Sequence, residues 1–411
     1  MKPLNKNILV ISTITILLTF CLRIPLTYAL ELAEIRDKKI NAVQSPSLGA
    51  PIIIQAGSDF SATVRTDIFG TVKNAWLSPI RDLESKMPLQ TSSTQKANGT
   101  AFYNMKTPSD IMPGLYDLNV SNADGNKDIQ PHSVKIVGEF KKDFFFVSIA
   151  DIHFGDSRGQ GFAAGKDLNV LRRNILQAAS RVNPEFILFV GDATNEPTTY
   201  RRDYQTAWEY FKEYLDAPMF MVPGNHDSYG LMKKDGAFLD GKEYWRAFFG
   251  PTYYYFDYGN LRFIGLDNYD WPPIFRRSLK LMSESESINT GNMGKDQFEW
   301  LQKTLPGAGE RTIIVFAHFP FDQMKGGAPF KGGKLPGIPK TEVLELLNKH
   351  GVSHIFIGHW HRNEIKDLIG IKQVMTNTSG SVLYSDVRWG FNTVYVKDGN
   401  IDRIEFTEVE F

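Results

Sequence analysis

The sequence predicts a mixed α/β protein that is preceded by a small all-β segment. Between about Leu30 and Glu139, short β-like runs are separated by clusters of Gly, Pro, Asn and Ser, and no helical period is present. Beyond Lys142, near-continuous apolar strands alternate with amphipathic helices, which is typical of a sheet covered by helices on both faces. The chain of 411 residues is long enough for both parts.

The first 29 residues have the features of a secretory signal peptide. Lys2 and Lys6 precede an apolar run at 8–22, and Ala29 ends a small-x-Ala cleavage motif. We expect cleavage after Ala29 and a secreted, periplasmic or cell-envelope location. The alternative is an uncleaved membrane anchor, but the run of 15 residues is shorter than the roughly 20 that span a bilayer. The single cysteine, Cys21, lies inside this run, so the mature protein would contain no disulfide.

Residues 30–139 are expected to form a small antiparallel sandwich of the immunoglobulin or fibronectin type. In residues 140–411, a first strand at 144–150 precedes a series of helix and strand pairs. The pairs are predicted at 168–182 and 186–190, 203–215 and 219–222, 295–305 and 312–317, and 341–351 and 354–358. A hairpin pattern at 253–268 and a β-rich stretch from about Lys372 indicate that the sheet is mixed.

Residue types that bind metals follow five of these strands. The five motifs are Asp151-Ile152-His153, Gly191-Asp192, Gly224-Asn225-His226-Asp227, His318, and Gly358-His359-Trp360-His361. Each motif alone is also compatible with a turn or a structural histidine. However, ligands of α/β sheets bind beyond the carboxyl ends of the strands, and five of the eight histidines stand there. Together the motifs predict a metal site.

The residue types suit two divalent cations held close together. Such cations repel each other, so they need a shared anionic ligand, and the Asp192 carboxylate can bridge them. Imidazoles suit Mn, Fe or Zn without adding negative charge that would repel a phosphate substrate. Asn225 would supply a neutral carbonyl oxygen for the same reason. We expect Gly224 to let the backbone turn Asn225 inward.

The ordered motifs resemble the signature of the calcineurin-like metallophosphoesterases. That signature is Asp-x-His, Gly-Asp, Gly-Asn-His-Asp/Glu, a lone His and Gly-His-x-His, and the likeness covers roughly Phe144 to Phe411. The resemblance implies a four-layer α/β/β/α sandwich in residues 140–411, with a dinuclear site at one edge of two central sheets.

The resemblance also implies roles for individual residues. It assigns Asp151, His153 and His361 to the first metal, Asn225, His318 and His359 to the second, and Asp192 to both. The cofactors would be two divalent ions, Mn, Fe or Zn. His226 and Asp227 are the candidate catalytic residues of the third motif. The implied mechanism is in-line attack on phosphorus by a metal-bound hydroxide, with His226 stabilising the transition state or protonating the leaving oxygen.

Two positions depart from related patterns. Asn195 stands where some members carry an Asp that pairs with the histidine of the third motif, so we expect the pKa of His226 to be raised less than by a carboxylate. Purple acid phosphatases have Gly in place of His153 and Tyr in place of Asn195. We therefore expect no tyrosinate-bound ferric site.

The predicted function is that of an exported, metal-dependent phosphoesterase, with phosphodiesters ahead of phosphomonoesters. One alternative is a nucleotidase or pyrophosphatase; another is a surface-binding protein on an inactive scaffold, which the retention of all seven predicted ligands disfavours. The partner would be a small phosphate ester. Equal numbers of basic and acidic residues, 46 each, argue against nucleic acid, and membrane contact is expected only if the N-terminal segment is uncleaved. No oligomeric state is predicted.

Basic residues in the loops between the motifs are candidates for a phosphate clamp. They are Arg276, Arg277, Lys325, Lys331 and Lys334. Guanidinium and ammonium groups favour phosphate oxygens. The alternative is that these are solvated loop charges without a role in substrate binding.

Overall fold

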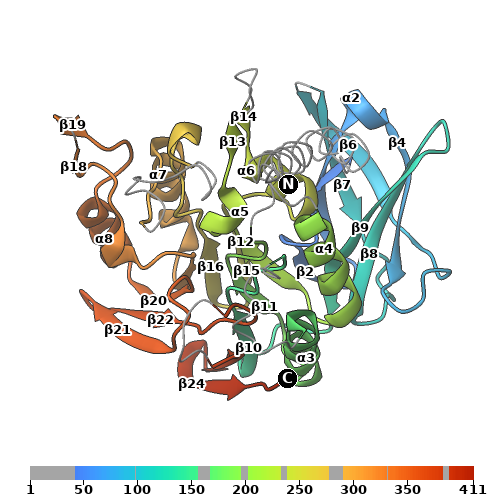
Figure 1. The fold of residues 1–411 in the computed structure, drawn as a ribbon. Coiled ribbons are helices and arrows are strands. Elements are labelled where there is room, and N and C mark those ends of the chain that lie inside the picture. Colours follow the sequence, from blue (N-terminus) through green and yellow to red (C-terminus); the bar gives the residue numbers. More distant parts are fainter. Residues whose placement is uncertain are drawn as a thin grey trace, which may run out of the picture. The chain divides into compact units, whose positions relative to one another are not determined.

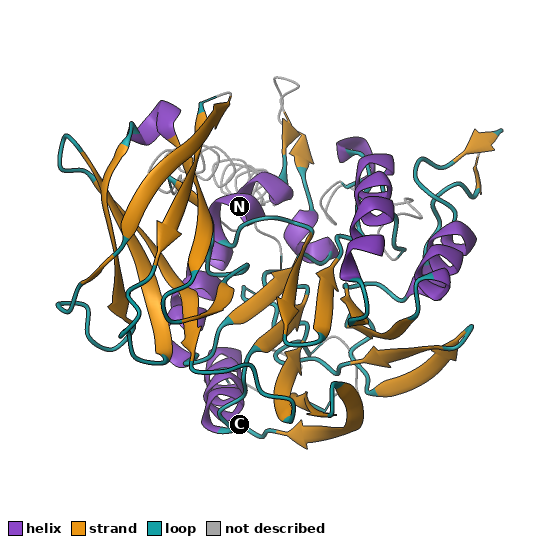
Figure 2. Cartoon of the chain, turned by 180° about the vertical axis from the view of Figure 1, so that it is seen from behind, coloured by secondary structure: helices purple, strands orange, loops and turns teal. Residues whose placement is uncertain are grey.

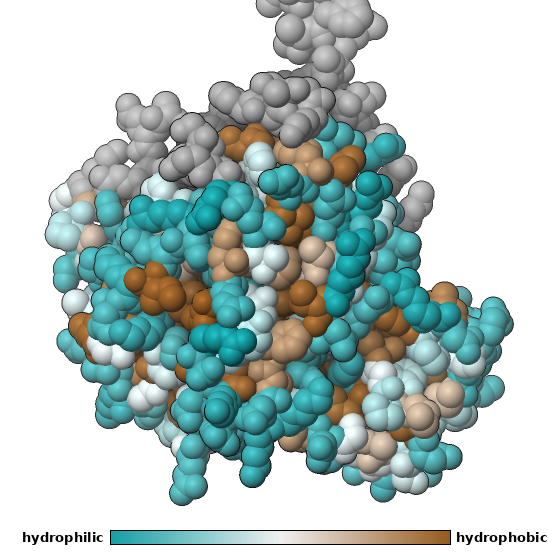
Figure 3. All heavy atoms as spheres, turned by 90° about the horizontal axis from the view of Figure 1, so that it is seen from below, coloured by the Kyte–Doolittle hydropathy of each residue, from teal (hydrophilic) through white to brown (hydrophobic). Residues whose placement is uncertain are grey.

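The computed structural model describes residues 42–97, 99–155, 167–195, 202–232, 238–276, 290–330, 332–382 and 388–411 (Figure 1). The predicted signal peptide, its cleavage site and Cys21 lie outside these residues. The described part is a mixed α/β structure with several sheets, as the sequence predicts. None of its helices combines the length and apolar character needed to cross a bilayer. On the face seen in Figure 3, apolar side chains form separate patches among hydrophilic ones.

Residues 43–137 form two β-sheets that share one core (Figure 2). The four-stranded sheet has the order β1 (Val43–Ser45), β3 (Asp59–Arg65), β7 (Thr100–Lys106) and β6 (Gln90–Ala97). The five-stranded sheet has the order β2 (Ile52–Gln55), β9 (Lys127–Val137), β8 (Gly114–Asn122), β4 (Val72–Pro79) and β5 (Met87–Pro88). Val64 and Leu118 are among the buried side chains between them.

The pairing in this segment differs in one respect from the predicted antiparallel sandwich. β2 and β9 run parallel, which their separation in sequence allows because no hairpin joins them. A single helical turn, α2 (Thr66–Phe69), follows β3. The domain boundaries at residues 29 and 139 stay predictions.

Two further sheets face each other across a second core. One has the order β12 (Met219–Val222), β11 (Ile187–Val190), β10 (Phe144–Ile149), β23 (Gly390–Lys397) and β24 (Asn400–Glu408). The other has the order β15 (Tyr254–Tyr258), β16 (Leu261–Gly265), β17 (Thr312–Phe316), β20 (Val352–Ile357), β22 (Ile371–Met375) and β21 (Glu364–Leu368). The ring of Phe146 lies 5.6 Å from that of Phe263 and 5.5 Å from that of Phe356 across the interface.

Both sheets are mixed, as predicted. β10, β11 and β12 are parallel to one another, and so are β16, β17, β20 and β22. The remaining strands pair antiparallel, including the predicted hairpin of β15 and β16. The carboxyl ends of the parallel strands therefore lie at one edge of each sheet, where the predicted motifs begin.

Helices cover the outer faces of the two sheets. They are α3 (Leu168–Arg181), α4 (Arg202–Tyr214), α7 (Lys295–Thr304) and α8 (Lys340–Lys349), and each begins and ends within two residues of its predicted bounds. Phe211 of α4 packs on Phe189 of β11, with ring centroids 5.4 Å apart, and α3 lies beside α4. Leu301 of α7 and Leu347 of α8 share a core with β20.

Shorter elements connect these layers. They are α5 (Asn225–Ser228), α6 (Gly241–Phe248), the pairs β13 (Leu231–Met232) with β14 (Phe238–Leu239) and β18 (Pro329–Phe330) with β19 (Gly333–Lys334), and the 3₁₀ turns η2 (Pro273–Phe275), η4 (Pro306–Ala308) and η5 (Phe321–Gln323). α6 is absent from the helices that the sequence predicts. Its signal was Asp240, whose side chain accepts a hydrogen bond from Lys242 N at 2.9 Å and caps the helix.

A turn at 47–50 lies against β12, the edge strand of the five-stranded sheet. Met221 N donates to Gly49 O at 2.7 Å, and Gly49 N donates to Phe249 O at 2.9 Å. A Cβ atom on Gly49 would lie 2.6 Å from Phe249 O, so no larger residue fits without displacement. The Ser47 hydroxyl also donates to Phe249 O, at 2.7 Å. The β-rich segment is thus joined to the α/β layers by backbone hydrogen bonds.

His132 of β9 is a buried histidine among charged groups. Its side chain is 4% exposed and its backbone N–H donates to the Asp117 carboxylate at 2.8 Å. Burial lowers the pKa of His132 to about 4, and the charges of Arg81 and Lys212 act in the same direction against that of Asp216. The imidazole is therefore neutral in the folded protein at neutral pH.

We predict that His132 makes the protein less stable in acid. The unfolded chain takes up a proton near pH 6.5 and the folded protein only near pH 4, so stability is lost as the pH falls through this window, by about 3 kcal/mol at most. His132→Asn should show a smaller loss, and Asn tolerates the left-handed φ of 52° at this position. Urea unfolding at pH 7, 5.5 and 4.5 checks this; equal losses in both proteins would contradict it.

Candidate metal centre

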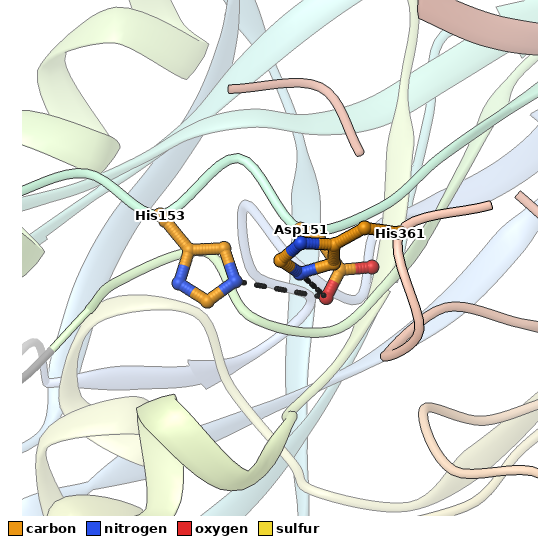
Figure 4. Close-up of side chains that lie close together, drawn as sticks. All are labelled: Asp151, His153 and His361. Atoms are coloured by element: carbon orange, nitrogen blue, oxygen red, sulfur yellow. Dashed lines mark ion pairs between the residues drawn. The ribbon is translucent and has the colours of Figure 1, made fainter. Parts of the chain in front are cut away.

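The predicted motifs come together at the edge where the parallel strands of both central sheets end. Asp151 and His153 follow β10, and His361 follows β20. The Nε2 atom of His361 lies 3.2 Å from Asp151 Oδ1, and the Nε2 atom of His153 lies 3.6 Å from the same oxygen (Figure 4). All three side chains are buried. This is the set that the resemblance assigns to the first metal.

Asp192 stands between this first set and a second one. Its Oδ2 atom lies 3.5 Å from His153 Nε2 and 3.2 Å from His318 Nε2. His318 Nε2 in turn lies 3.0 Å from Asn225 Oδ1, and His359 completes a cluster with Asp192 and His318. One carboxylate thus joins two groups of ligand atoms, as expected for a bridging ligand.

The donor set fits divalent cations. Ligand atoms about 2.1 Å from one ion and at right angles to each other lie about 3.0 Å apart, close to the separations around His318 Nε2. His318 Nδ1 lies 2.9 Å from Val190 O, which can only accept, so Nδ1 carries the proton and Nε2 faces the cluster. Among the described residues, the buried Nε2 atom of His359 has no hydrogen-bond partner, which suits a nitrogen reserved for a metal.

The pKa values in this cluster reflect two buried carboxylates close together. Burial opposes charge on His318, but Asp192 and Asp151 raise its pKa to about 9. Burial likewise opposes charge on Asp192, yet the neighbouring His318 and His226 keep its pKa below the usual range. The pKa of His359 is lowered well below its usual value, by burial and then by His318. The carboxylates therefore favour positive charge on His318, whereas burial disfavours it on His359.

Most predicted ligands sit on an uncommon backbone conformation. A left-handed φ is found at Asp151 (52°), His153 (49°), Asp192 (57°), His359 (77°) and His361 (51°). Such a conformation costs a non-glycine residue on the order of 1 kcal/mol and tends to occur at functional sites. At the strand ends this conformation interrupts the extended chain, so these predicted ligands stand in turns that follow the strands.

Gly224 has a different role from the predicted one. Its φ of −96° is open to any residue, so the expectation that it turns Asn225 inward through backbone freedom is wrong. A Cβ atom on Gly224 would lie 2.0 Å from Asp192 Oδ1. The glycine is needed because the bridging carboxylate occupies the space of a side chain.

The glycines of two other motifs make room in the same way. A Cβ atom on Gly191 would lie 2.5 Å from His318 Nδ1, and one on Gly358 would lie 2.4 Å from Asp151 Oδ2. Each glycine therefore leaves space for a predicted ligand carried by a different strand.

Asp227 holds the loop that carries Asp192. Its carboxylate accepts hydrogen bonds from Gly224 N (2.9 Å), Ala193 N (3.2 Å), Thr194 N (2.8 Å) and Thr194 Oγ1 (2.9 Å). Burial and the nearby Asp192 raise the pKa of Asp227 to about 6. Both oxygens of Asp227 accept from these donors, so the residue positions the third motif against the second. A direct catalytic role for Asp227 stays a prediction.

His226 lies at the rim of the cluster and is half-buried. Its backbone N–H donates to Asp192 Oδ1 at 2.9 Å, and its ring lies 4.6 Å from that of His153. Its Nδ1 atom lies 2.7 Å from the backbone oxygen of Asn195, which leaves Nε2 as the nitrogen available to a substrate. Burial lowers the pKa of His226 to about 4 although Asp192 opposes this. His226 also forms a cluster with His153 and Asp192 that could hold an ion.

The Asn195 side chain does not replace the carboxylate partner of His226. Its Oδ1 atom faces His153 Nδ1 at 3.4 Å instead, and only the backbone oxygen contacts His226. The predicted pairing of the Asn195 side chain with His226 is therefore wrong, because the backbone oxygen of Asn195 contacts the imidazole in its place.

The proposed phosphate clamp is wrong for Arg276. Its guanidinium is buried and donates to both oxygens of Asp240, at 2.6 and 2.8 Å, and to Ser228 O at 2.7 Å. Lys325 and Lys334 are exposed, while Arg277 and Lys331 lie outside the described residues.

Arg172 is a supporting residue that the sequence analysis did not single out. It is 2% exposed, and its guanidinium donates to Ile152 O at 2.8 Å, His153 O at 2.6 Å and Gly380 O at 3.3 Å. These bonds hold the left-handed turn of the first motif. The available signal was an arginine within the apolar stripe of the helix, four residues after Leu168.

Residues 146–363 match the model of the family described as calcineurin-like phosphoesterase, which is more than half of the chain. The chain therefore belongs to this family, whose members hydrolyse phosphate esters at dinuclear metal centres. It is 24% identical over 219 residues to a probable glycerophosphodiester phosphodiesterase of Arcobacter nitrofigilis, covering 53% of this chain and 71% of the relative. It is 25% identical over 266 residues to the serine/threonine-protein phosphatase CPPED1 of Mus musculus, covering 60% and 79%.

A solved structure shows the likeness of the fold. The purple acid phosphatase PPD1 from yellow lupin (Lupinus luteus) superposes with a TM-score of 0.50 and 14% identity, covering 86% of this chain and 71% of the lupin chain. The shared fold agrees with the mixed α/β arrangement of the two central sheets.

We predict that Gly224→Ala lowers the free energy of unfolding by about 1–3 kcal/mol, because the added methyl group overlaps the Asp192 carboxylate. Gly333→Ala is the matched control, since its Cβ would meet only Phe330 O at 3.8 Å and its effect should stay within about 0.5 kcal/mol. Urea unfolding of both variants measures the difference. Equal stabilities would show that Gly224 is not sterically required.

We predict that Arg172→Met lowers the free energy of unfolding by about 3 kcal/mol, because the carbonyl oxygens of the first motif lose charged donors in a buried place. Arg173→Met, at the half-buried neighbouring position, should cost less than about 1 kcal/mol. Chemical denaturation reports both values, and a small cost for Arg172→Met would show that the turn holds itself.

Proposed function

We propose that the protein hydrolyses a small phosphate ester, with diesters ahead of monoesters, at a dinuclear centre formed by its seven predicted ligands. The observation that carries this proposal is the position of Asp192, 3.5 Å from His153 and 3.2 Å from His318. A single buried carboxylate between two imidazole groups suits a bridge between two cations. The proposed ligands are Asp151, His153, Asp192, Asn225, His318, His359 and His361.

The residues around the centre have separate proposed tasks. Bound cations would supply an activated water and neutralise charge on the phosphate oxygens. His226, with Nδ1 held by Asn195 O, directs Nε2 toward the substrate. It would stabilise or protonate the leaving oxygen only as the doubly protonated imidazolium, which the negative charge of a bound phosphate favours. Asp227 keeps Gly224 and the Asp192 loop together so that the ligands converge.

The preference for diesters rests on residue identities, because the relatives are divided between the two substrate classes. The first relative is named as a probable glycerophosphodiester phosphodiesterase and the mouse protein as a serine/threonine-protein phosphatase. His153 and Asn195 differ from the Gly and Tyr of purple acid phosphatases, so a tyrosinate-bound ferric site is not part of this proposal.

We also propose that residues 30–139 form an all-β domain and that residues 1–29 direct export. The lupin phosphatase fold covers 86% of the chain, whereas residues 140–411 account for about two thirds of it, which supports a shared fold for part of the N-terminal segment. The charged start, apolar run and Ala29 motif support export. N-terminal sequencing of the protein recovered outside the cytoplasm should begin at Leu30; an intact Met1 would favour the anchor.

We predict that metal-stripped protein regains hydrolysis of bis(4-nitrophenyl) phosphate when Mn, Zn or Fe is added, and that 4-nitrophenyl phosphate is turned over more slowly. Asp192→Asn should lower turnover at least 100-fold, because the bridge loses its charge. Release of 4-nitrophenolate at matched protein concentrations measures all three rates. Metal-independent hydrolysis, or an Asp192→Asn variant as active as the wild type, would overturn the proposal.

A further inference from the structure

We propose that Tyr229 is a positioning residue that holds the amide of Asn225 toward the second metal position. The inference rests on the proposed function, because it takes Asn225 as a ligand. Nothing in the ordered motifs assigns a role to Tyr229, which lies four residues after Asn225 at the end of α5.

The geometry around Asn225 divides its amide between two partners. The Nδ2 group donates to the Tyr229 hydroxyl at 2.6 Å, while Oδ1 faces His318 Nε2 at 3.0 Å. Asn225 is 1% exposed and Tyr229 is fully buried. The hydroxyl therefore holds the nitrogen side of the amide and leaves the oxygen side to the cluster.

Tyr229 is itself held rigidly. It belongs to an apolar cluster with Tyr269, Trp271, Phe319 and Leu335. Its ring also lies 5.0 Å from that of His226. The backbone on either side is fixed by Arg276, whose guanidinium donates to Ser228 O at 2.7 Å and whose carbonyl accepts from Gly230 N at 2.5 Å. The buried pair of Arg276 with Asp240 thus supports the hydroxyl that contacts Asn225.

Removing this hydroxyl should weaken one metal position selectively. A buried amide N–H without an acceptor costs about 1–3 kcal/mol, so the Asn225 side chain would turn to find another partner. Partners of metal ligands commonly change metal affinity by 10- to 100-fold when removed. The first metal position does not use Asn225, so its affinity should be unchanged.

The test is a titration of metal-stripped full-length protein with Mn²⁺, and isothermal titration calorimetry measures the binding. Wild type should bind two ions. Tyr229→Phe should bind one ion normally and the other at least 10-fold more weakly. Tyr269→Phe is the matched control, because Tyr269 is equally buried in the same cluster and its hydroxyl has no hydrogen-bond partner among the described residues. Both of its affinities should stay within twofold of wild type.

Three results separate the possible outcomes. Equal losses in Tyr229→Phe and Tyr269→Phe, or no loss in either, would overturn the inference. Fewer than two ions bound by wild type would instead contradict the proposed function on which it rests.

Discussion

The arrangement of the site depends on one buried carboxylate, that of Asp192. Its two oxygens face the backbone N–H of His226 and the imidazoles of His153 and His318, so every neighbouring strand end is placed relative to it. Two buried carboxylates and several buried imidazoles repel or attract one another strongly, because burial reduces the screening of their charges. Gly224 leaves space for this carboxylate because it has no side chain. The hydrogen bonds of Asp227 hold the backbone around it.

The same site concentrates backbone strain. Five predicted ligands have a left-handed φ, and each such residue is stable only if its surroundings impose the conformation. Arg172 does so for the first motif by donating to the carbonyls of Ile152 and His153, and the Thr378 hydroxyl donates to Asp151 O at 2.6 Å. The hydrophobic cores behind the strands stabilise the fold, and this stability offsets the cost of the left-handed backbone at the ligands. Stability and ligand geometry are therefore coupled in this protein.

Periodicity predicted most of the fold because strands such as Met219–Val222 and helices such as Leu168–Arg181 carry their own local signals. The order of motifs at the strand ends likewise predicted which residues converge. What the sequence did not reveal depends on contacts through space. The parallel pairing of β2 with β9, the Asp192 oxygen next to Gly224, the Asp240 partner of Arg276 and the amide held by Tyr229 all join residues whose proximity no local pattern encodes.

The turn at 47–50 has a consequence beyond the attachment of the N-terminal segment. β12 is the last strand of its sheet, and an uncovered last strand offers its peptide groups to any passing chain. Gly49 occupies part of that row by accepting from Met221 N, and its contact with Phe249 O keeps it there. The β-rich segment thus covers part of a sheet edge at which another chain could otherwise add a strand, and it does so on the strand that leads into the third motif.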